Sequence, residues 1–243
     1  MKGTLWLIIL FLTASGAVVA LSATTSHGKP LRRLTVVIDA SHDGGAWWFP
    51  QGPPPLDPRK PHQGSALAEH LRNRGWRVIE ISRNTIITNQ LKGASIVIRM
   101  NFFGSYAESE VAAYREYVQR GGRLLLIQGY VREYEAQNDT VAQQLGVRFE
   151  GVVETAVMQG AGEPNKDFNE ALFRIGSVVV LYPYSTRRLA QLADGRLVMG
   201  MAMYGRGRMI FLSSVFPVLQ IAQPFTMRLL DELAKPVFKP KRK

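Results

Sequence analysis

The stretch LTVVIDASHDGG, Leu34–Gly45, decides the fold of this chain. Its first part is an apolar, β-branched run that ends in Asp39, and a turn-rich segment with Ser41, His42 and Asp43 follows. The apolar run predicts a buried strand, and the turn predicts that this strand delivers polar side chains to the carboxyl edge of a sheet. Open α/β folds bind ligands at that edge, so we expect a candidate site here.

Strand-like and helix-like segments alternate along the rest of the chain. The expected strands are 34–39, 76–81, 95–100, 123–127, 147–150, 177–182, 197–204 and 208–212. The expected helices are 63–74, 85–92, one that opens at a Ser105–Glu108 capping-box pattern, 140–145 with Asn138 or Asp139 as its cap, and 224–234. This alternation predicts an α/β domain over residues 31–234, with a mostly parallel sheet that antiparallel C-terminal strands extend. Residues 151–176 are expected to be an irregular insertion, and Gly205–Gly207 a hairpin turn.

Residues 1–26 are expected to form a signal peptide or an N-terminal anchor. Lys2 precedes a segment without charged side chains, whose most apolar part is LWLIILFL at Leu5–Leu12. Ala20 and Ala23 are candidate cleavage sites among the small residues that follow. Residues 5–23 are also close to the ~20 residues that span a bilayer, so an uncleaved anchor stays open. The sequence therefore predicts export to the periplasm or another extracytoplasmic space.

The charge and the cysteine content limit the kinds of site and partner that this chain can have. The chain contains no cysteine, which excludes disulfides, thiolate metal ligands and a cysteine nucleophile. The formal net charge is +11, and the basic tail 235–243, KPVFKPKRK, carries no acidic residue. This tail is either a solvated end or a contact to an anionic membrane or wall surface. Nucleic acid is not an expected partner, because export is predicted and no nucleic-acid-binding motif is present.

Ile38–Gly45, IDASHDGG, resembles the IDPGHGG motif of N-acetylmuramoyl-alanine amidases, which are zinc enzymes of the bacterial envelope. The resemblance implies that His42 is the first zinc ligand. It places Arg99 where that family has its second histidine, and a guanidinium cannot bind zinc because it stays protonated. Gln63 stands near the expected glutamate ligand, with His62 beside it. No metal site is therefore predicted, although a site rebuilt from His42 and His62 stays open.

A longer resemblance, over about Leu34 to Val218, is to the class I glutamine-amidotransferase-like domains of unknown function. The matching phrases are ITNQLKGASIVI at Ile87–Ile98, SEVAAYREYVQRGGRLLLI at Ser109–Ile127, VAQQLGVRF at Val141–Phe149 and YGRGRMIFLSS at Tyr204–Ser214. The resemblance implies a three-layer, flavodoxin-like α/β fold. Active amidotransferases place a nucleophilic cysteine after a central strand, where this chain has Gln128. The resemblance therefore implies the fold without the thiol chemistry.

A doubly wound sheet would bring the loops after its neighbouring strands together. The candidate ligand-binding residues are Asp39, His42, Asp43, Asn101 and Gln128. The structural alternative is that Asp39 caps loop amides and His42 satisfies a buried backbone group. Trp47 and Trp48, in the long loop 40–62, are expected either to contact a sugar or partner chain or to lie over the core.

Two functions from different classes remain. The first is an exported, non-catalytic domain that binds a small ligand or a protein partner at the bacterial cell envelope, with no catalytic residue and no cofactor. The second is a divergent, zinc-dependent N-acetylmuramoyl-alanine amidase that acts on peptidoglycan. Arg99 at the second ligand position favours the first hypothesis, so enzymatic activity is not expected.

Overall fold

A computed structural model describes residues 34–39, 41–42, 63–81, 86, 88–101, 106–128, 139–157, 159–160, 172–181, 186–213 and 223–235. These residues belong to one compact unit, Arg33–Lys243. The predicted signal or anchor and the loop with Asp43, Trp47 and Trp48 lie outside the described residues, as does the basic tail after Lys235. No helix among the described residues is both long enough and apolar enough to cross a membrane.

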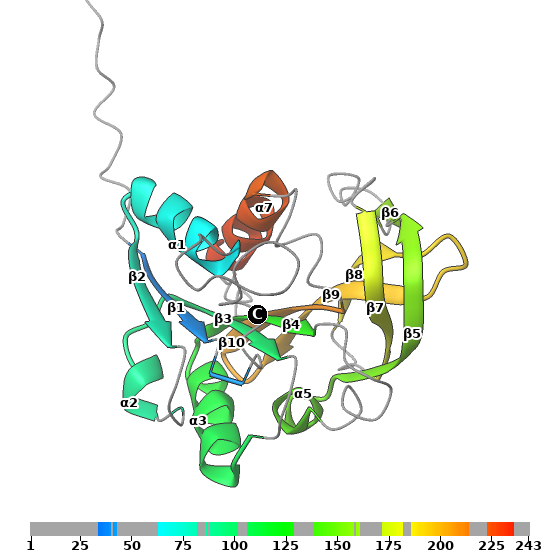
Figure 1. The fold of residues 1–243 in the computed structure, drawn as a ribbon. Helices are drawn as coiled ribbons and strands as arrows, with labels where there is room; N and C mark the ends of the chain where they lie inside the picture. The colour runs from blue at the N-terminus through cyan, green and yellow to red at the C-terminus, as the bar shows by residue number, and fades with distance from the viewer. Residues whose placement is uncertain are drawn as a thin grey trace, which may run out of the picture. The chain divides into compact units, whose positions relative to one another are not determined.

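A single large sheet organises the fold (Figure 1). Its strands are β1 (Thr35–Asp39), β2 (Arg77–Ile81), β3 (Ile96–Asn101), β4 (Arg123–Gln128), β6 (Gln159–Gly160), β8 (Arg187–Gln191), β9 (Leu197–Tyr204) and β10 (Gly207–Leu212). They form an eight-stranded sheet in the order β2-β1-β3-β4-β10-β9-β8-β6. The strands from β2 to β10 in this order are parallel, and β9, β8 and β6 extend the sheet antiparallel. Numbered along the chain, the parallel strands have the flavodoxin-like order, so the predicted fold class is confirmed.

Helices cover both faces of the sheet (Figure 1). They are α1 (Gln63–Asn73), α2 (Thr88–Leu91), α3 (Glu108–Gln119), α5 (Thr140–Gln144) and α7 (Gln223–Ala234). Ile38 of β1 packs in the core layer of α1 and α7, whereas its neighbour Val37 packs in the layer of α2, α3 and α5. Successive strand residues face opposite layers, so a central parallel strand is apolar on both sides. This explains why the strand segments read as nearly unbroken apolar runs.

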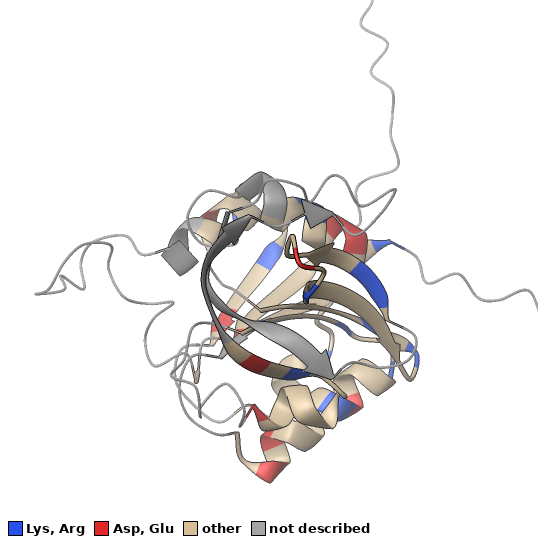
Figure 2. Ribbon diagram, turned by 90° about the vertical axis from the view of Figure 1, so that its right-hand side faces the viewer, with Lys and Arg blue, Asp and Glu red and all other residues tan. Residues whose placement is uncertain are grey.

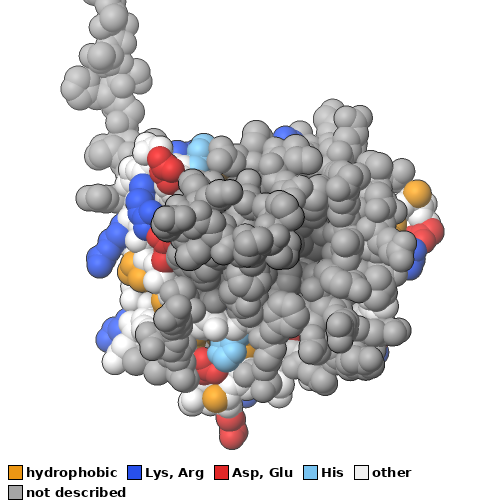
Figure 3. All heavy atoms as spheres, in the orientation of Figure 1, with side chains coloured by type: hydrophobic (Ala, Val, Ile, Leu, Met, Phe, Trp, Pro, Cys, Tyr) orange, Lys and Arg blue, Asp and Glu red, His pale blue; other side chains and the backbone are white. Residues whose placement is uncertain are grey.

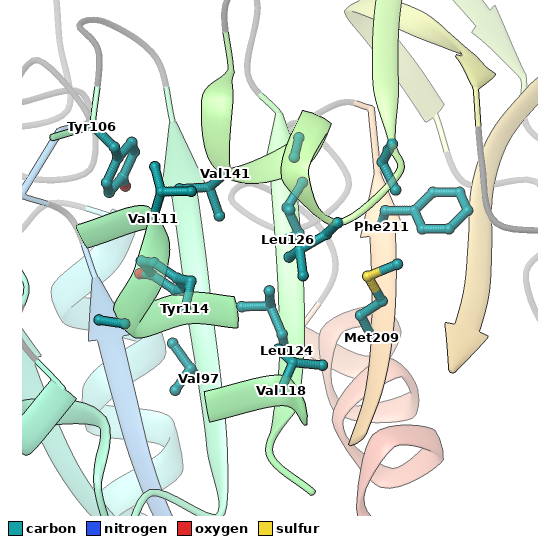
Figure 4. Close-up of a cluster of buried hydrophobic side chains, with 14 of the residues drawn as sticks. Val97, Tyr106, Val111, Tyr114, Val118, Leu124, Leu126, Val141, Met209 and Phe211 are labelled. Atoms are coloured by element: carbon teal, nitrogen blue, oxygen red, sulfur yellow. The ribbon is translucent and has the colours of Figure 1, made fainter. Parts of the chain in front are cut away.

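Helix α3 supplies much of the second layer. Val111, Tyr114 and Val118 point from α3 toward the apolar side chains of β3 and β4 (Figure 4). The predicted start at Ser105 is wrong, because the helix begins at Glu108 with Ala107 as its N-cap. The carboxylate of Glu110 accepts the Ala107 backbone N–H at 2.8 Å. This bond satisfies a free amide at the start of the helix and fixes the boundary.

Residues after β4 depart most from the prediction. Strand β5 (Arg148–Val157) pairs antiparallel with β7 (Leu172–Leu181) in a separate two-stranded sheet. The expected irregular insertion over 151–176 therefore contains strands. Gly151 has a φ of +65°, and the β5–β7 register shifts between Glu150 and Val153. This irregularity conceals the strand, because a bulge breaks the alternation from which strands are predicted. Strand β8 is likewise absent from the prediction, and its register with β9 shifts on both sides of Ala190.

Charged side chains occur on both strands and helices of the described residues (Figure 2), but few of them are buried. The buried charged residues of the described chain lie on strands or at helix starts: Asp39, Arg99, Glu110, Asp139 and Arg208. A buried charge is costly unless it is paired or hydrogen-bonded. All of these residues except Arg208 meet beneath α3 and α5, and they define the candidate site.

The predicted hairpin at Gly205–Gly207 is confirmed and packs against the end of α3. A Cβ on Gly207 would lie 2.0 Å from the carbonyl oxygen of Val118, a backbone atom that cannot rotate away. Gly207→Ala should therefore lower the free energy of unfolding by about 3 kcal/mol, the upper range for overpacking. Urea denaturation followed by circular dichroism measures the loss.

Gly75→Ala is the matched control for this substitution. Gly75 has a φ of +80°, and no heavy atom of the described residues lies within 4 Å of the position that its Cβ would take. Only backbone strain of about 1 kcal/mol is therefore expected. Equal losses in the two variants would contradict close packing of the hairpin against α3.

Candidate functional site

The candidate site lies where β1 and β3 run side by side. The chain passes from β1 to β2 on one side, and β3 lies on the other, which makes this the switch point of the sheet. Asp39 ends β1 and is paired in register with Arg99 of β3. Arg99, Asp39 and Gln128 of β4 follow the strand alternation into the layer of α3 and α5, and all are 0% exposed. Three neighbouring strands therefore place polar side chains on one buried face.

Asp39 is hydrogen-bonded through both carboxylate oxygens. Oδ2 accepts the hydroxyls of Tyr106, at 3.1 Å, and Tyr114. Oδ1 accepts the backbone N–H of Ser41 at 2.9 Å and its hydroxyl at 2.6 Å. Burial raises the pKa of both tyrosines well above the usual value, so they remain protonated donors. The expectation that Asp39 caps a loop amide is confirmed at Ser41.

His42 joins the turn after β1 to the start of α3. Its Nε2 lies 3.0 Å from Oε1 of Glu110, and the same oxygen accepts the backbone N–H of Ile86 at 2.7 Å. Burial acts to raise the pKa of Glu110, but hydrogen bonds from Ala107, His42 and Ile86 outweigh it and lower that pKa. The Glu110 carboxylate is thus ionised at neutral pH and accepts from His42. Among the described residues, the partner of His42 is therefore a carboxylate and not the backbone group that the structural alternative expects.

Arg99 forms a buried, two-pronged ion pair with Asp139. Its Nη1 donates to Oδ1 at 3.0 Å, and its Nη2 donates to Oδ2. Oδ1 of Asp139 also accepts the Ala142 N–H at 2.9 Å, which makes Asp139, rather than Asn138, the cap of α5. Burial acts to lower the pKa of Arg99, but the nearby Asp139 carboxylate raises it overall, so the guanidinium is charged.

Tyr106 connects these groups. Its ring centroid lies 4.0 Å from that of His42 and 4.8 Å from the guanidinium carbon of Arg99. Tyr106 also meets the ring of Tyr114 edge-on at 5.9 Å, and both hydroxyls reach Asp39. Contact of an aromatic ring with a guanidinium is favourable, more so when it is shielded from water. The ring therefore links β1, β3 and the turn that carries His42.

Gln128 differs from its neighbours. Neither Nε2 nor Oε1 of its side chain has a hydrogen-bond partner among the described residues, although Gln128 is fully buried. A buried amide without partners costs about 1–3 kcal/mol. Gln128 is paired in backbone register with Asn101, which places it closer to the carboxyl edge than Arg99. An unpaired carboxamide at that edge is the feature that points to a ligand.

The structure brings some predicted site residues together. Asp39 and His42 both contact Tyr106, and Gln128 lies on the same face of the sheet without bonding to either. Asn101 ends β3 beside Gln128, and its side chain is outside the described residues, as are Asp43, Trp47 and Trp48. The sequence did not indicate Tyr106, Tyr114 or Glu110 as part of this site. A lone arginine in the apolar run SIVIRMN was the available signal, because a buried guanidinium requires a carboxylate.

Within the described part of the chain, no group of three or more histidine and carboxylate side chains could share a metal ion. His42 is occupied by Glu110, and Arg99, at the expected second zinc-ligand position, is occupied by Asp139. These residues do not fit the zinc site of the amidases.

Comparisons with known proteins show what the fold of this chain is similar to. No protein-family model matches the chain, and no curated protein matches it. Its fold is similar to the cytoplasmic protein STM3548 from Salmonella typhimurium, with a TM-score of 0.59 and 14% identity over 84% of this chain and 100% of that one. A putative ThuA-like protein from Bacteroides uniformis matches with a TM-score of 0.53 and 15% identity, over 87% and 93% of the two chains.

A β-galactosidase from Rahnella sp. R3 matches with a TM-score of 0.54 and 17% identity, over 85% of this chain but 32% of the enzyme. At these identities the similarity is one of fold alone. The chain thus has a flavodoxin-like α/β fold of the kind found in a ThuA-like protein.

The ion pair of Arg99 and Asp139 has a measurable role in stability. Asp139→Asn keeps a helix-capping side chain but leaves the Arg99 charge buried without a counter-charge. The free energy of unfolding should fall by about 3 kcal/mol, as measured by urea denaturation. Arg120→Gln removes the exposed Arg120–Glu116 pair as a control and should cost less than about 1 kcal/mol. A loss of that small size in Asp139→Asn would contradict the buried pair.

The lowered pKa of Glu110 predicts a dependence of stability on acid. The unfolded chain binds a proton at the usual pKa of 4.5, above the folded value, so stability is lost as pH falls through the folded pKa. Glu110→Gln should be less stable at neutral pH and should lose less stability on acidification. Denaturant titrations on both sides of pH 4.5 measure how the free energy of unfolding changes with pH in the wild-type protein and in the variant. Glu108→Gln, at an exposed position at the same end of α3, is the control. If Glu110→Gln kept the pH dependence of the wild-type protein, that dependence would not come from Glu110.

Proposed function

We propose that this protein is an exported, non-catalytic α/β domain that binds a small ligand or a segment of a protein partner at the bacterial cell envelope. The binding site is the carboxyl edge of the sheet at Gln128. The single observation that supports this proposal is the buried Gln128 carboxamide, whose donor and acceptor both lack partners in the part of the chain that the structure describes. Export rests on the apolar N-terminal segment over residues 1–26.

The state of the other polar groups favours binding over catalysis. A general base needs a carboxylate or imidazole that is free to take a proton from substrate. The oxygens of Asp39 are held by Tyr106, Tyr114 and Ser41, and Nε2 of His42 is held by Glu110. The hydroxyl of the buried Ser213 donates to the Val198 carbonyl at 3.1 Å, so it is not oriented as a nucleophile. The chain also contains no cysteine.

The chemistry of Gln128 indicates the kind of ligand. A carboxamide offers a donor and an acceptor side by side, and its natural complement is another amide. Acetamido sugars and peptide groups carry such a pair, and both are available at a bacterial envelope. The amidase hypothesis has less support, because Arg99 is fixed to Asp139 where a zinc ligand would be needed. Stoichiometric zinc in the purified protein, lost in His42→Ala, would favour that hypothesis instead.

Gln128→Leu separates a binding role from a structural one. Without ligand, the leucine removes an unpaired amide from the interior, so stability should rise by about 1 kcal/mol. In the wild-type protein, N-acetylglucosamine should shift the Gln128 side-chain amide signals saturably in ¹H–¹⁵N NMR spectra. The substitution removes these side-chain signals, so binding to the variant is followed by the backbone amide signals of β3 and β4, and their saturable shifts should be abolished.

Gln144→Leu, at an exposed position on α5, is the matched control and should leave both stability and binding unchanged. Destabilisation by Gln128→Leu beyond about 1 kcal/mol would mean that the amide is paired in the folded chain. Saturable binding that persists in Gln128→Leu would place the site elsewhere.

A further inference from the structure

A second surface lies at the β2 edge of the sheet, away from Gln128. Strand β2 is the terminal strand, and β1 is its neighbour in the strand order. The Arg77 N–H donates inward to the Leu34 carbonyl at 2.9 Å. Because alternate residues of a strand direct their backbone groups to opposite sides, Val78 and Glu80 direct theirs outward. Among the described residues, no strand pairs with this outer side.

A cavity of about 610 Å³ runs along the same edge, on the face covered by α2. Its apolar floor comes from Val37 of β1 and from Ile79 and Ile81 of β2, and its wall is the segment from Asn89 to Ala94. Helix α2 has only four residues, so it leaves Ile79 partly exposed. A free strand edge beside pockets for alternate side chains is the arrangement by which folded domains bind extended peptides as an added strand.

The charges at the rim select the kind of peptide. Arg77 and Lys92 line the cavity, and no described carboxylate forms an ion pair with either. The acidic lining residue, Glu80, is already paired with Arg72. Basic side chains of the described residues lie along this side of the molecule, at the left of Figure 3, with acidic side chains among them. The rim is therefore cationic and complements acidic side chains.

The same charges disfavour the other occupants of a strand edge. A second copy would bring its own Arg77 and Lys92 to the shared edge, and like charges there oppose pairing. The segment that precedes β1, 27–33, carries Lys29, Arg32 and Arg33 and no acidic residue. We infer that the β2 edge binds an extended, acidic peptide segment of another protein, which adds to the sheet as a strand.

Fluorescence anisotropy of a labelled peptide of alternating valine and aspartate tests this inference with the full-length protein. Each of Arg77→Glu and Lys92→Glu should weaken binding about fivefold, the effect of one exposed charge pair. Arg115→Glu makes the same charge change on the exposed side of α3 and should have no effect. Val78→Pro removes an outward N–H without touching the β1 ladder and should abolish binding, whereas Val78→Thr should retain it.

Three results would overturn the inference. A peptide with lysine in place of aspartate could bind equally well, which would remove the charge argument. Val78→Pro could bind like the wild-type protein while unfolding at the same denaturant concentration, which would exclude strand addition. Light scattering could detect a dimer that Val78→Pro dissociates, which would assign the edge to a second copy. None of these outcomes depends on Gln128, so they leave the proposed ligand site to its own test.

Discussion

The buried ion pair of Arg99 and Asp139 is the constraint on which the carboxyl edge of this sheet depends. Both side chains are withdrawn from water, with 0% and 1% exposure, and removing a charge from water costs several kcal/mol. The two-pronged contact offsets that cost only while both partners stay in place. Because Asp139 also caps α5, one carboxylate fixes a helix start to the middle of the sheet. Arg99 further contacts the ring of Tyr106, so the constraint reaches Asp39 on the neighbouring strand.

The polar groups beneath α3 are otherwise arranged to satisfy each other. Asp39, Glu110 and Asp139 each accept several hydrogen bonds, and each links segments that are distant in sequence. Such a network rigidifies the strand ends, but it leaves few groups with capacity for a ligand. Among the described residues of this face, Nε of Arg99 and Oγ1 of Thr140 also lack a partner, but Gln128 is the side chain whose donor and acceptor groups are both unpaired. An unpaired buried amide lowers the stability of the folded chain. Proteins tolerate such destabilising groups mainly at functional positions.

Sequence patterns predicted the elements well and their side-chain partners poorly. Nearly unbroken apolar runs located β1, β3 and β4, and the alternation of these runs with helical segments predicted a mostly parallel sheet. Periodicity reports which face a residue occupies, but not which distant residue it meets. Arg99 and Asp139 are 40 positions apart, and His42 and Glu110 are 68 apart, so only the folded chain selects these pairs. The strand after Gly151 escaped prediction for a different reason, because its bulge interrupts the alternation itself.

The proposed peptide-binding edge of β2 depends on the distribution of charge between the interior and the surface. Among the described residues, the interior holds three carboxylates, Asp39, Glu110 and Asp139, but only two guanidinium groups, Arg99 and Arg208. These buried groups carry a net charge of −1, so the described residues outside the interior are one unit more positive than a count over all described residues. A positive surface attracts acidic chains over a distance of about one Debye length and does not by itself select a position. The outward backbone groups of β2, which no described strand pairs with, act only at contact distance. Because they lie beside a cationic rim, an attracted acidic chain can bind there as an added strand.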